Sequence, residues 1–328
     1  MPVKALAAAG ICLATLGAAA AWLTSGHEPS PPCNGLAQDT RVRTSMGAAI
    51  QPGMSCAALG EAIVKATAGS EPGRHARAQA QAMKDVLFAL AWVQPKNFDV
   101  DPARRGPLAT ALADYGPDLH EMLAGLDSDH VLKAGRDTPP WEAGGTYRLS
   151  VYHTVFRATL RAVAEDPRAY ALLRLAETRT AAERLAAVPA GATGSELSLR
   201  PTRNARALGI LDGIADAANG QGAAEARKWH ATVLDHLLDD QADQAGQADQ
   251  TGQADQAGQA VSAGHLTATW LQELKDTPET ARAERLRTQG VDMARTWAQA
   301  RGMDEQTRKD LLPEVGNSAR YAYREPRP

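Results

Sequence analysis

The stretch TYRLSVYHTVFRATLRAVAE, residues 146–165, shows most clearly how this chain folds. Its apolar residues recur at helical spacing, which places them on one face of an α-helix and leaves the arginines on the other. That apolar face would consist of Leu149, Tyr152, His153, Phe156, Leu160 and Val163, opposite Arg148, Arg157 and Arg161. We therefore expect an amphipathic helix that packs on a core, with His153 as a core histidine.

The rest of the chain repeats this helical pattern between breaks made by proline and glycine. Ser55 can cap one helix, Asp166-Pro167 is typical of the first turn of another, and the Gly-rich stretch 189–201 is expected to be a loop. Aromatic residues, which favour strands, make up only 5% of the chain. The expected helices cover residues 55–67, 75–93, 107–115, 118–126, 146–165, 166–188, 202–218, 223–240, 265–275, 278–301 and 304–311. The sequence thus predicts an all-α protein, an irregular multi-helix bundle.

An apolar segment precedes this bundle. Residues 5–23, ALAAAGICLATLGAAAAWL, carry no charge and follow Lys4. As a helix they would span about 29 Å, enough for the hydrocarbon core of a bilayer. Small residues such as Ala18 and Ala20 also suit a signal peptidase, so residues 1–24 are a signal peptide or a signal anchor. With Lys4 on the cytosolic side, we expect the bundle outside the membrane, either anchored through residues 5–23 or secreted.

The cysteines agree with an extracytoplasmic location. Cys33 and Cys56 are the two thiols that follow the apolar segment, and they lie close together in the sequence. Disulfides persist in oxidising compartments, so we expect a Cys33–Cys56 bridge. It would close the Pro/Ser-rich stem and loop of residues 25–54 against the main helical domain, residues 55–240.

A repeat interrupts the helical pattern. Residues 241–260 read QADQAG, QADQTG, QADQAG, QA, with a period of six. This period gives no apolar stripe, and each glycine disfavours a helix, so the segment is predicted to be a low-complexity flexible linker. It would separate the main domain from C-terminal helices at 261–312 and a tail at 313–328. A cation site made of the repeat's aspartates, Asp243, Asp249 and Asp255, is the alternative, although the spacing is not that of a calcium loop.

Two histidine clusters are the candidates for metal ligation. His120-Glu121 begins like a zinc-protease helix but lacks the second histidine, and His130 follows nearby. His236 and Asp240 are four residues apart and share a helix face. Neither cluster supplies a complete ligand set, and surface or helix-end residues explain both. We expect no cofactor.

The remaining sequence signals concern binding rather than catalysis. The net charge of −3 gives no basic field for nucleic acid. Two arginine clusters could contact an anionic envelope polymer or a lipid headgroup, and otherwise they are a solvated face and a frayed tail. They comprise Arg200, Arg203 and Arg206, and Arg320, Tyr321, Tyr323, Arg324 and Arg327.

Three functional hypotheses follow. The first is a non-enzymatic envelope protein that binds another protein or an envelope component. The alternative is a secreted or anchored cell-wall hydrolase with a carboxylate or metal site, and a third is a bundle that holds a small apolar ligand. Convergent carboxylates and histidines in a pocket would favour the enzyme, an arginine-rich face the binder, and a closed apolar cavity the carrier.

Overall fold

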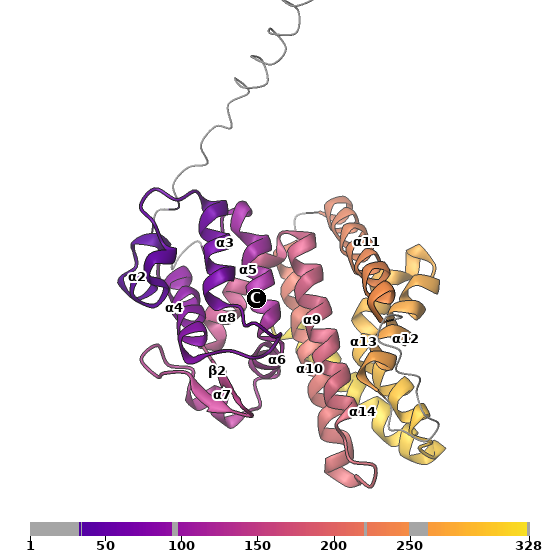
Figure 1. The fold of residues 1–328 in the computed structure, drawn as a ribbon. Coiled ribbons are helices and arrows are strands. Elements are labelled where there is room, and N and C mark those ends of the chain that lie inside the picture. Colours follow the sequence, from indigo (N-terminus) through magenta and orange to yellow (C-terminus); the bar gives the residue numbers. More distant parts are fainter. Residues whose placement is uncertain (1–32, 34, 94–97, 220–221, 249–261, 327–328) are drawn as a thin grey trace, which may run out of the picture.

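The chain folds into a bundle of helices with one short β-hairpin (Figure 1). The computed structural model describes residues 33, 35–93, 98–219, 222–248 and 262–326. The prediction of a mainly helical, multi-helix fold is confirmed for these residues. The helices of the first half are α2 (Thr40–Met46), α3 (Cys56–Thr67), α4 (Arg77–Val93), α5 (Pro102–Asp114), α6 (Gly116–Ala124), α7 (Ser128–Leu132) and α8 (His153–Ala164), with 3₁₀ turns at Leu36–Gln38 and Gly47–Ala49. Those of the second half are α9 (Pro167–Ala186), α10 (Gly194–Ala218), α11 (Ala223–Ala248), α12 (Ala263–Asp276), α13 (Glu279–Ala300) and α14 (Glu305–Arg324).

Two central helices join the halves. α9 packs against α5 and α6 of the first half and against α11 and α12 of the second, while α10 packs against α6 and α8 on one side and against α13 and α14 on the other. The buried apolar side chains form one contiguous cluster that extends from Cys33 to Ala322. The C-terminal helices α12 to α14 pack on the preceding helices and share their core.

Helix caps follow the sequence signals. The Ser55 side chain accepts a hydrogen bond from the backbone N–H of Ala58, and Asp166 accepts from Arg168 and Ala169 ahead of Pro167. Each cap satisfies an N–H group that the first turn of a helix leaves without a partner. Both predicted helix starts are confirmed.

The stretch that opened the sequence analysis is only partly helical. Residues Thr146–Arg148 form strand β2, which pairs with β1 (Trp141–Ala143), and α8 begins at His153. The reason is the turn at Gly144-Gly145: both glycines have positive φ, which suits a two-residue hairpin turn. The prediction that His153 is a core histidine is wrong, because the side chain lies exposed at the start of α8.

Three helices are longer than the sequence suggested. α10 begins at Gly194 within the expected loop, and α11 continues to Ala248, through the first residues of the repeat. The later part of the repeat, residues 249–261, lies outside the described residues. α14 reaches Arg324, so most of the expected tail is helix. Packing explains this last difference, because the helix buries an apolar stripe made of Leu311, Val315, Ala319 and Ala322.

Close backbone contact holds α14 on α10. A Cβ atom at Gly209 would lie 2.5 Å from the carbonyl oxygen of Ala319, and one at Gly213 would lie 2.3 Å from that of Tyr323. The two glycines are four residues apart and therefore share one face of α10. Small residues at this spacing allow two helices to approach closely, and here they admit the backbone of α14.

Within the described residues, no helix is both long and apolar enough to cross a membrane. The predicted export segment, residues 5–23, is outside them.

Candidate functional site

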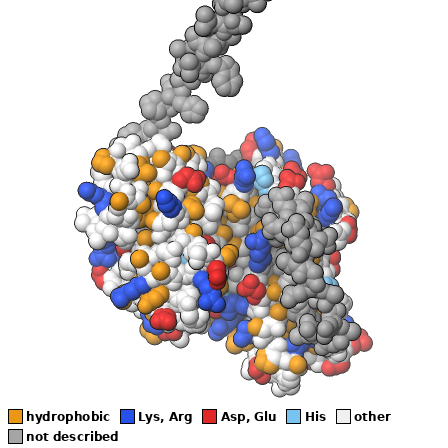
Figure 2. Space-filling view, viewed as in Figure 1, with side chains coloured by type: hydrophobic (Ala, Val, Ile, Leu, Met, Phe, Trp, Pro, Cys, Tyr) orange, Lys and Arg blue, Asp and Glu red, His pale blue; other side chains and the backbone are white. Residues whose placement is uncertain are grey.

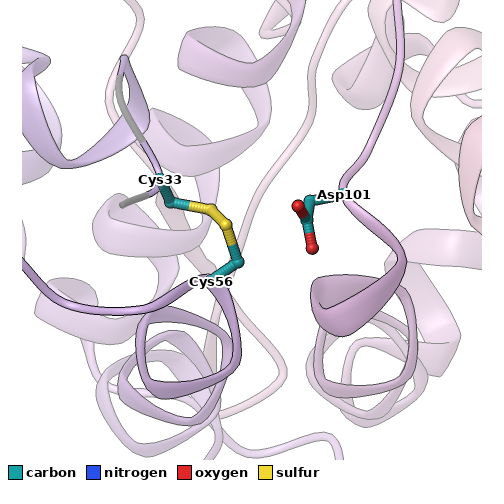
Figure 3. Close-up of side chains that lie close together, drawn as sticks. All are labelled: Cys33, Cys56 and Asp101. Atoms are coloured by element: carbon teal, nitrogen blue, oxygen red, sulfur yellow. A yellow bond between two sulfur atoms is a disulfide. The ribbon is translucent and has the colours of Figure 1, made fainter. Parts of the chain in front are cut away.

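The expected disulfide is present, with Cys33 bonded to Cys56 at the first turn of α3. Asp101, the N-cap of α5, lies next to the two sulfur atoms (Figure 3). In the described part of the chain, these three residues are the single group of histidine, cysteine or carboxylate side chains close enough to share a metal ion. The sulfur atoms are bonded to each other, so in this state they are not thiolate ligands.

The first pair of predicted metal ligands is separated by its own contacts. His120 is fully buried between α6 and α9, and its Nδ1 lies 2.7 Å from Oε1 of Glu177. Glu121 points elsewhere and pairs with Arg184 of α9, with 2.5 Å between the carboxylate and guanidinium. These two neighbours in sequence thus make separate contacts between the same two helices.

His130, the next predicted ligand, lies between two aspartates. Its Nε2 lies 2.9 Å from Oδ1 of Asp118, and its Nδ1 lies 2.8 Å from Oδ1 of Asp127. Burial opposes the charged imidazolium, but the two carboxylates act more strongly and raise the pKa of His130. The ring also contacts Trp141 of the hairpin edge to face. This histidine ties α7 and the hairpin to α6.

The second predicted pair lies on α11. His236 is half-buried there, and the side chain of Asp240 is outside the described residues. Among the described residues, His120, Glu121, His130 and His236 belong to no group of three or more side chains that could hold a metal ion.

Four histidines have their ring nitrogens turned to protein groups or sealed from solvent. His130 uses both nitrogens, and His120 uses one and buries the other. His75 has Nε2 at 2.9 Å from Asp114 and stacks on Tyr115. His230 faces Asp216 with Nε2 at 3.6 Å, and its Nδ1 is buried. A general base needs a nitrogen within reach of the substrate, which the buried rings of His75, His120 and His130 do not offer, whereas His230 lines a surface depression.

A concave site lies between α10, α13 and α14. It is a pocket of about 540 Å³ with a mostly apolar wall that includes Val291, Pro313 and Ala319. Three arginines line it, Arg287 from α13 and Arg320 and Arg324 from α14. We call this site the arginine pocket.

The inner wall of the pocket carries the carboxylate of Asp212, and a buried arginine neutralises its charge. Asp212 of α10 accepts hydrogen bonds from the Tyr170 hydroxyl, at 2.8 Å, and from the guanidinium of Arg174. Arg174 is fully buried, and it also donates to Gln289 and to the backbone carbonyl of Leu286 in α13. Burial raises the pKa of Asp212, and the adjacent guanidinium opposes that rise. The charge of Asp212 is thus balanced within the core rather than by a ligand.

A second carboxylate organises the pocket's side wall. Asp216 accepts a hydrogen bond from the hydroxyl of Tyr323, and the guanidinium of Arg287 lies over the Tyr323 ring, 5.9 Å from its centroid. Burial would raise the pKa of Asp216, but hydrogen bonds from His230 and Tyr323 and the charge of Arg287 outweigh it and lower the pKa. This carboxylate, which is ionised at neutral pH, holds Tyr323 and Arg287 in place.

Among the described residues, one exposed carboxylate lines the arginine pocket. Glu284 lines it and accepts from Arg287 at 2.9 Å, whereas Arg320 bonds to the side-chain amide oxygen of Asn317. With Asp212 already neutralised, the pocket carries a surplus of positive charge. By contrast, acidic and basic side chains are interspersed on the face seen in Figure 2, with no field of one sign.

The sequence identified part of this pocket. It singled out Arg320, Tyr323 and Arg324 but not Arg287, whose role depends on how α13 lies against α14. The other arginine cluster has structural roles, since Arg206 donates to the carbonyl oxygen of Ala124 at the end of α6 and pairs with Glu325.

Comparisons of the chain with protein-family models, with curated proteins and with solved structures return no match.

Proposed function

We propose that this chain is an exported, non-enzymatic binding protein that holds an anionic envelope component in the arginine pocket. The observation that carries the proposal is the charge of that pocket. Arg287, Arg320 and Arg324 meet at an apolar cavity whose inner carboxylate is already paired with Arg174. Guanidinium groups suit carboxylates and phosphates because they donate two parallel hydrogen bonds.

The size and lining of the cavity suggest the kind of ligand. About 540 Å³ lies within the range of small-molecule sites, and such sites combine apolar walls with a few placed polar groups. A ligand with an apolar portion and one anionic group would satisfy both the wall and the arginines. A second depression of about 710 Å³ shares Arg287 and leads past Asp216 to Arg161, so a longer anionic chain has room to continue.

Three of the histidines are unavailable for hydrolysis. The rings of His75, His120 and His130 are buried against carboxylates, and the lowered pKa of Asp216 suits positioning more than proton donation. Release of soluble fragments from cell-wall material by the purified chain would instead support the alternative, an exported hydrolase.

Calorimetry with three probes of equal length tests the proposal. We expect octyl phosphate and octanoate to bind and octanol to bind far more weakly, because only the first two offer an anion to the arginines. Arg320→Ala and Arg324→Ala should each weaken octyl phosphate binding about tenfold or more, the cost of one charged hydrogen bond. Lys309→Ala, which removes one charge from an exposed position on the same helix, is the matched control.

Two results would contradict this function. Octanol binding as tightly as octyl phosphate would indicate an apolar carrier, and an equal loss in Lys309→Ala would indicate a non-specific effect of net charge.

Export is tested separately by a reporter fused after residue 30, which should be active only outside the cytoplasm. Mass spectrometry of the mature N-terminus then distinguishes a cleaved signal from a membrane anchor at residues 5–23.

A further inference from the structure

The disulfide and its neighbouring carboxylate form a cluster that is separate from the arginine pocket. The sulfur atoms of Cys33 and Cys56 and one carboxylate oxygen of Asp101 all lie within 4.8 Å of one another. Figure 3 shows the Asp101 carboxylate beside the disulfide, carried by a different helix. Three chain segments thus bring two sulfur atoms and an oxygen to one point between α3 and α5.

Two of the three residues lie at the start of a helix. Cys56 is the first residue of α3 and Asp101 is the N-cap of α5, so both lie at the positive end of a helix dipole. Asp101 uses one oxygen to accept a hydrogen bond from the backbone N–H of Ala103, at 2.9 Å. Both cysteines are more than nine-tenths buried. Two thiolates and a carboxylate in such a setting are a suitable ligand set for a thiophilic divalent cation.

We propose that Cys33, Cys56 and Asp101 form a redox-gated site that binds a divalent cation such as Zn²⁺ when the disulfide is reduced. A thiol reductant supplies two electrons and two protons to the disulfide and is itself oxidised to a disulfide. The cation then displaces the two thiol protons, which pass to solvent, and forms bonds to both sulfur atoms and to an Asp101 oxygen. Three protein ligands leave one position of a tetrahedral ion to water.

The movement that this requires is small. Thiolate ligands of one tetrahedral zinc ion lie about 3.8 Å apart, given Zn–S bonds of about 2.3 Å. The Cα atoms of the cysteines are 4.9 Å apart, and Cys33 precedes the first 3₁₀ turn, whereas Cys56 and Asp101 are fixed by α3 and α5. Cys33 can therefore move away from Cys56 without displacing a helix.

Zinc titration of the full chain in its two redox states tests this site. Cys12→Ser is included throughout, so that Cys33 and Cys56 are the only thiols. The chain is reduced with a dithiol, desalted, and titrated with Zn²⁺ in competition with a chromophoric chelator, beside the oxidised chain. Co²⁺ titration reports sulfur ligation through its thiolate charge-transfer absorption.

Asp101→Asn is the decisive variant. Asparagine caps helices as well as aspartate does, so it keeps the start of α5 while it removes the anionic ligand. Asp99→Asn is the matched control, because Asp99 is an exposed carboxylate two residues away that pairs with Arg105.

The site predicts one Zn²⁺ per reduced chain, a higher melting temperature with Zn²⁺, and no binding at this affinity by the oxidised chain. Loss of a residue that merely supports a metal ligand already weakens metal binding about tenfold. We therefore expect Asp101→Asn to weaken Zn²⁺ binding by at least this factor, and Asp99→Asn to leave it unchanged. Reduced wild-type chain that fails to bind, or Asp101→Asn that binds as tightly as wild type, would overturn the proposal. Loss of structure on reduction would give Asp101-independent binding, which also counts against it.

Discussion

Two regions of this protein bury charged side chains in different ways. In the C-terminal seam, where α9 and α10 meet α13 and α14, the buried charge belongs to Arg174, which joins three helices through Asp212, Gln289 and the carbonyl oxygen of Leu286. In the hairpin corner, formed by α6, α7 and the β-hairpin, it belongs to His130, held between Asp118 and Asp127.

The two buried cations differ in how their charge depends on pH. Arginine keeps its charge throughout the accessible range, so the cation of the seam does not titrate, whereas burial raises the pKa of its partner Asp212. The charge of His130 is lost as pH rises through its raised pKa, and the hairpin corner then loses its ion pairs. The seam also forms the arginine pocket.

The largest effect should come from removing the charge at the centre of the seam. Arg174→Met leaves the buried carboxylate of Asp212 without its cation, and breaking a buried pair on one side costs about 3–5 kcal/mol. We expect a fall in melting temperature of roughly 10 °C for a chain of this size. Arg168→Met, the same exchange at an exposed position of α9, should change little. A similar loss in both variants would mean that the buried network does not hold the seam.

A smaller effect is expected from widening the contact between α10 and α14. Gly213→Ala places a methyl group 2.3 Å from the carbonyl oxygen of Tyr323, so α14 must shift, at about 1–3 kcal/mol for an overpacked contact. Because Tyr323 and Arg324 belong to the shifted segment, octyl phosphate binding should weaken as well. The control is Gly264→Ala on α12, where a Cβ atom meets open space and alanine should stabilise the helix slightly. Unchanged stability and binding in Gly213→Ala would contradict the tight contact.

The stability that the hairpin corner contributes should depend on pH. The pKa of His130 is raised in the folded chain above its ordinary value of 6.5, so its contribution is complete below that value and is lost as pH rises through the folded pKa. The pKa of Asp127 is lowered by His130, although burial alone would raise it, so its contribution is lost only in acid, below its ordinary value of 3.8. His130→Gln should therefore cost about 1–3 kcal/mol at pH 5.5, and less at pH 8.5.

Chemical denaturation at both pH values measures this difference. His153→Gln, the same exchange at an exposed ring, separates the loss of the cluster from the exchange itself. A cost of His130→Gln that did not change with pH would contradict the ion pairs of the hairpin corner.

Helical periodicity and capping residues predicted most of the helices, since these signals are local. Ser55 and Asp166 begin helices as their side chains require. The segment 146–165 misled the sequence analysis because the spacing of Leu149 and Phe156 suits a helix, while Gly144-Gly145, a strong hairpin signal, precedes it. The sequence did not predict the length of α14, because α14 packs on Gly209 and Gly213 of α10, which are distant from it in sequence.

The candidate site was less predictable because it is assembled from distant segments. Arg320, Tyr323 and Arg324 stood out as neighbours in sequence, but Arg287 joins them only through the packing of α13 on α14. The pairing of Asp212 with Arg174 links positions 38 residues apart, and no local pattern indicates that this carboxylate is already neutralised. The disulfide was predictable because it needed only two thiols that follow the apolar segment and lie close together in sequence.

The most direct test of the account is a crystal structure of the chain with octyl phosphate bound. We expect the phosphate group within hydrogen-bond distance of at least two of the guanidinium groups of Arg287, Arg320 and Arg324, with the alkyl chain along the wall that includes Val291 and Pro313. A phosphate group bound elsewhere on the protein, with the pocket empty at saturating concentration, would contradict the central claim.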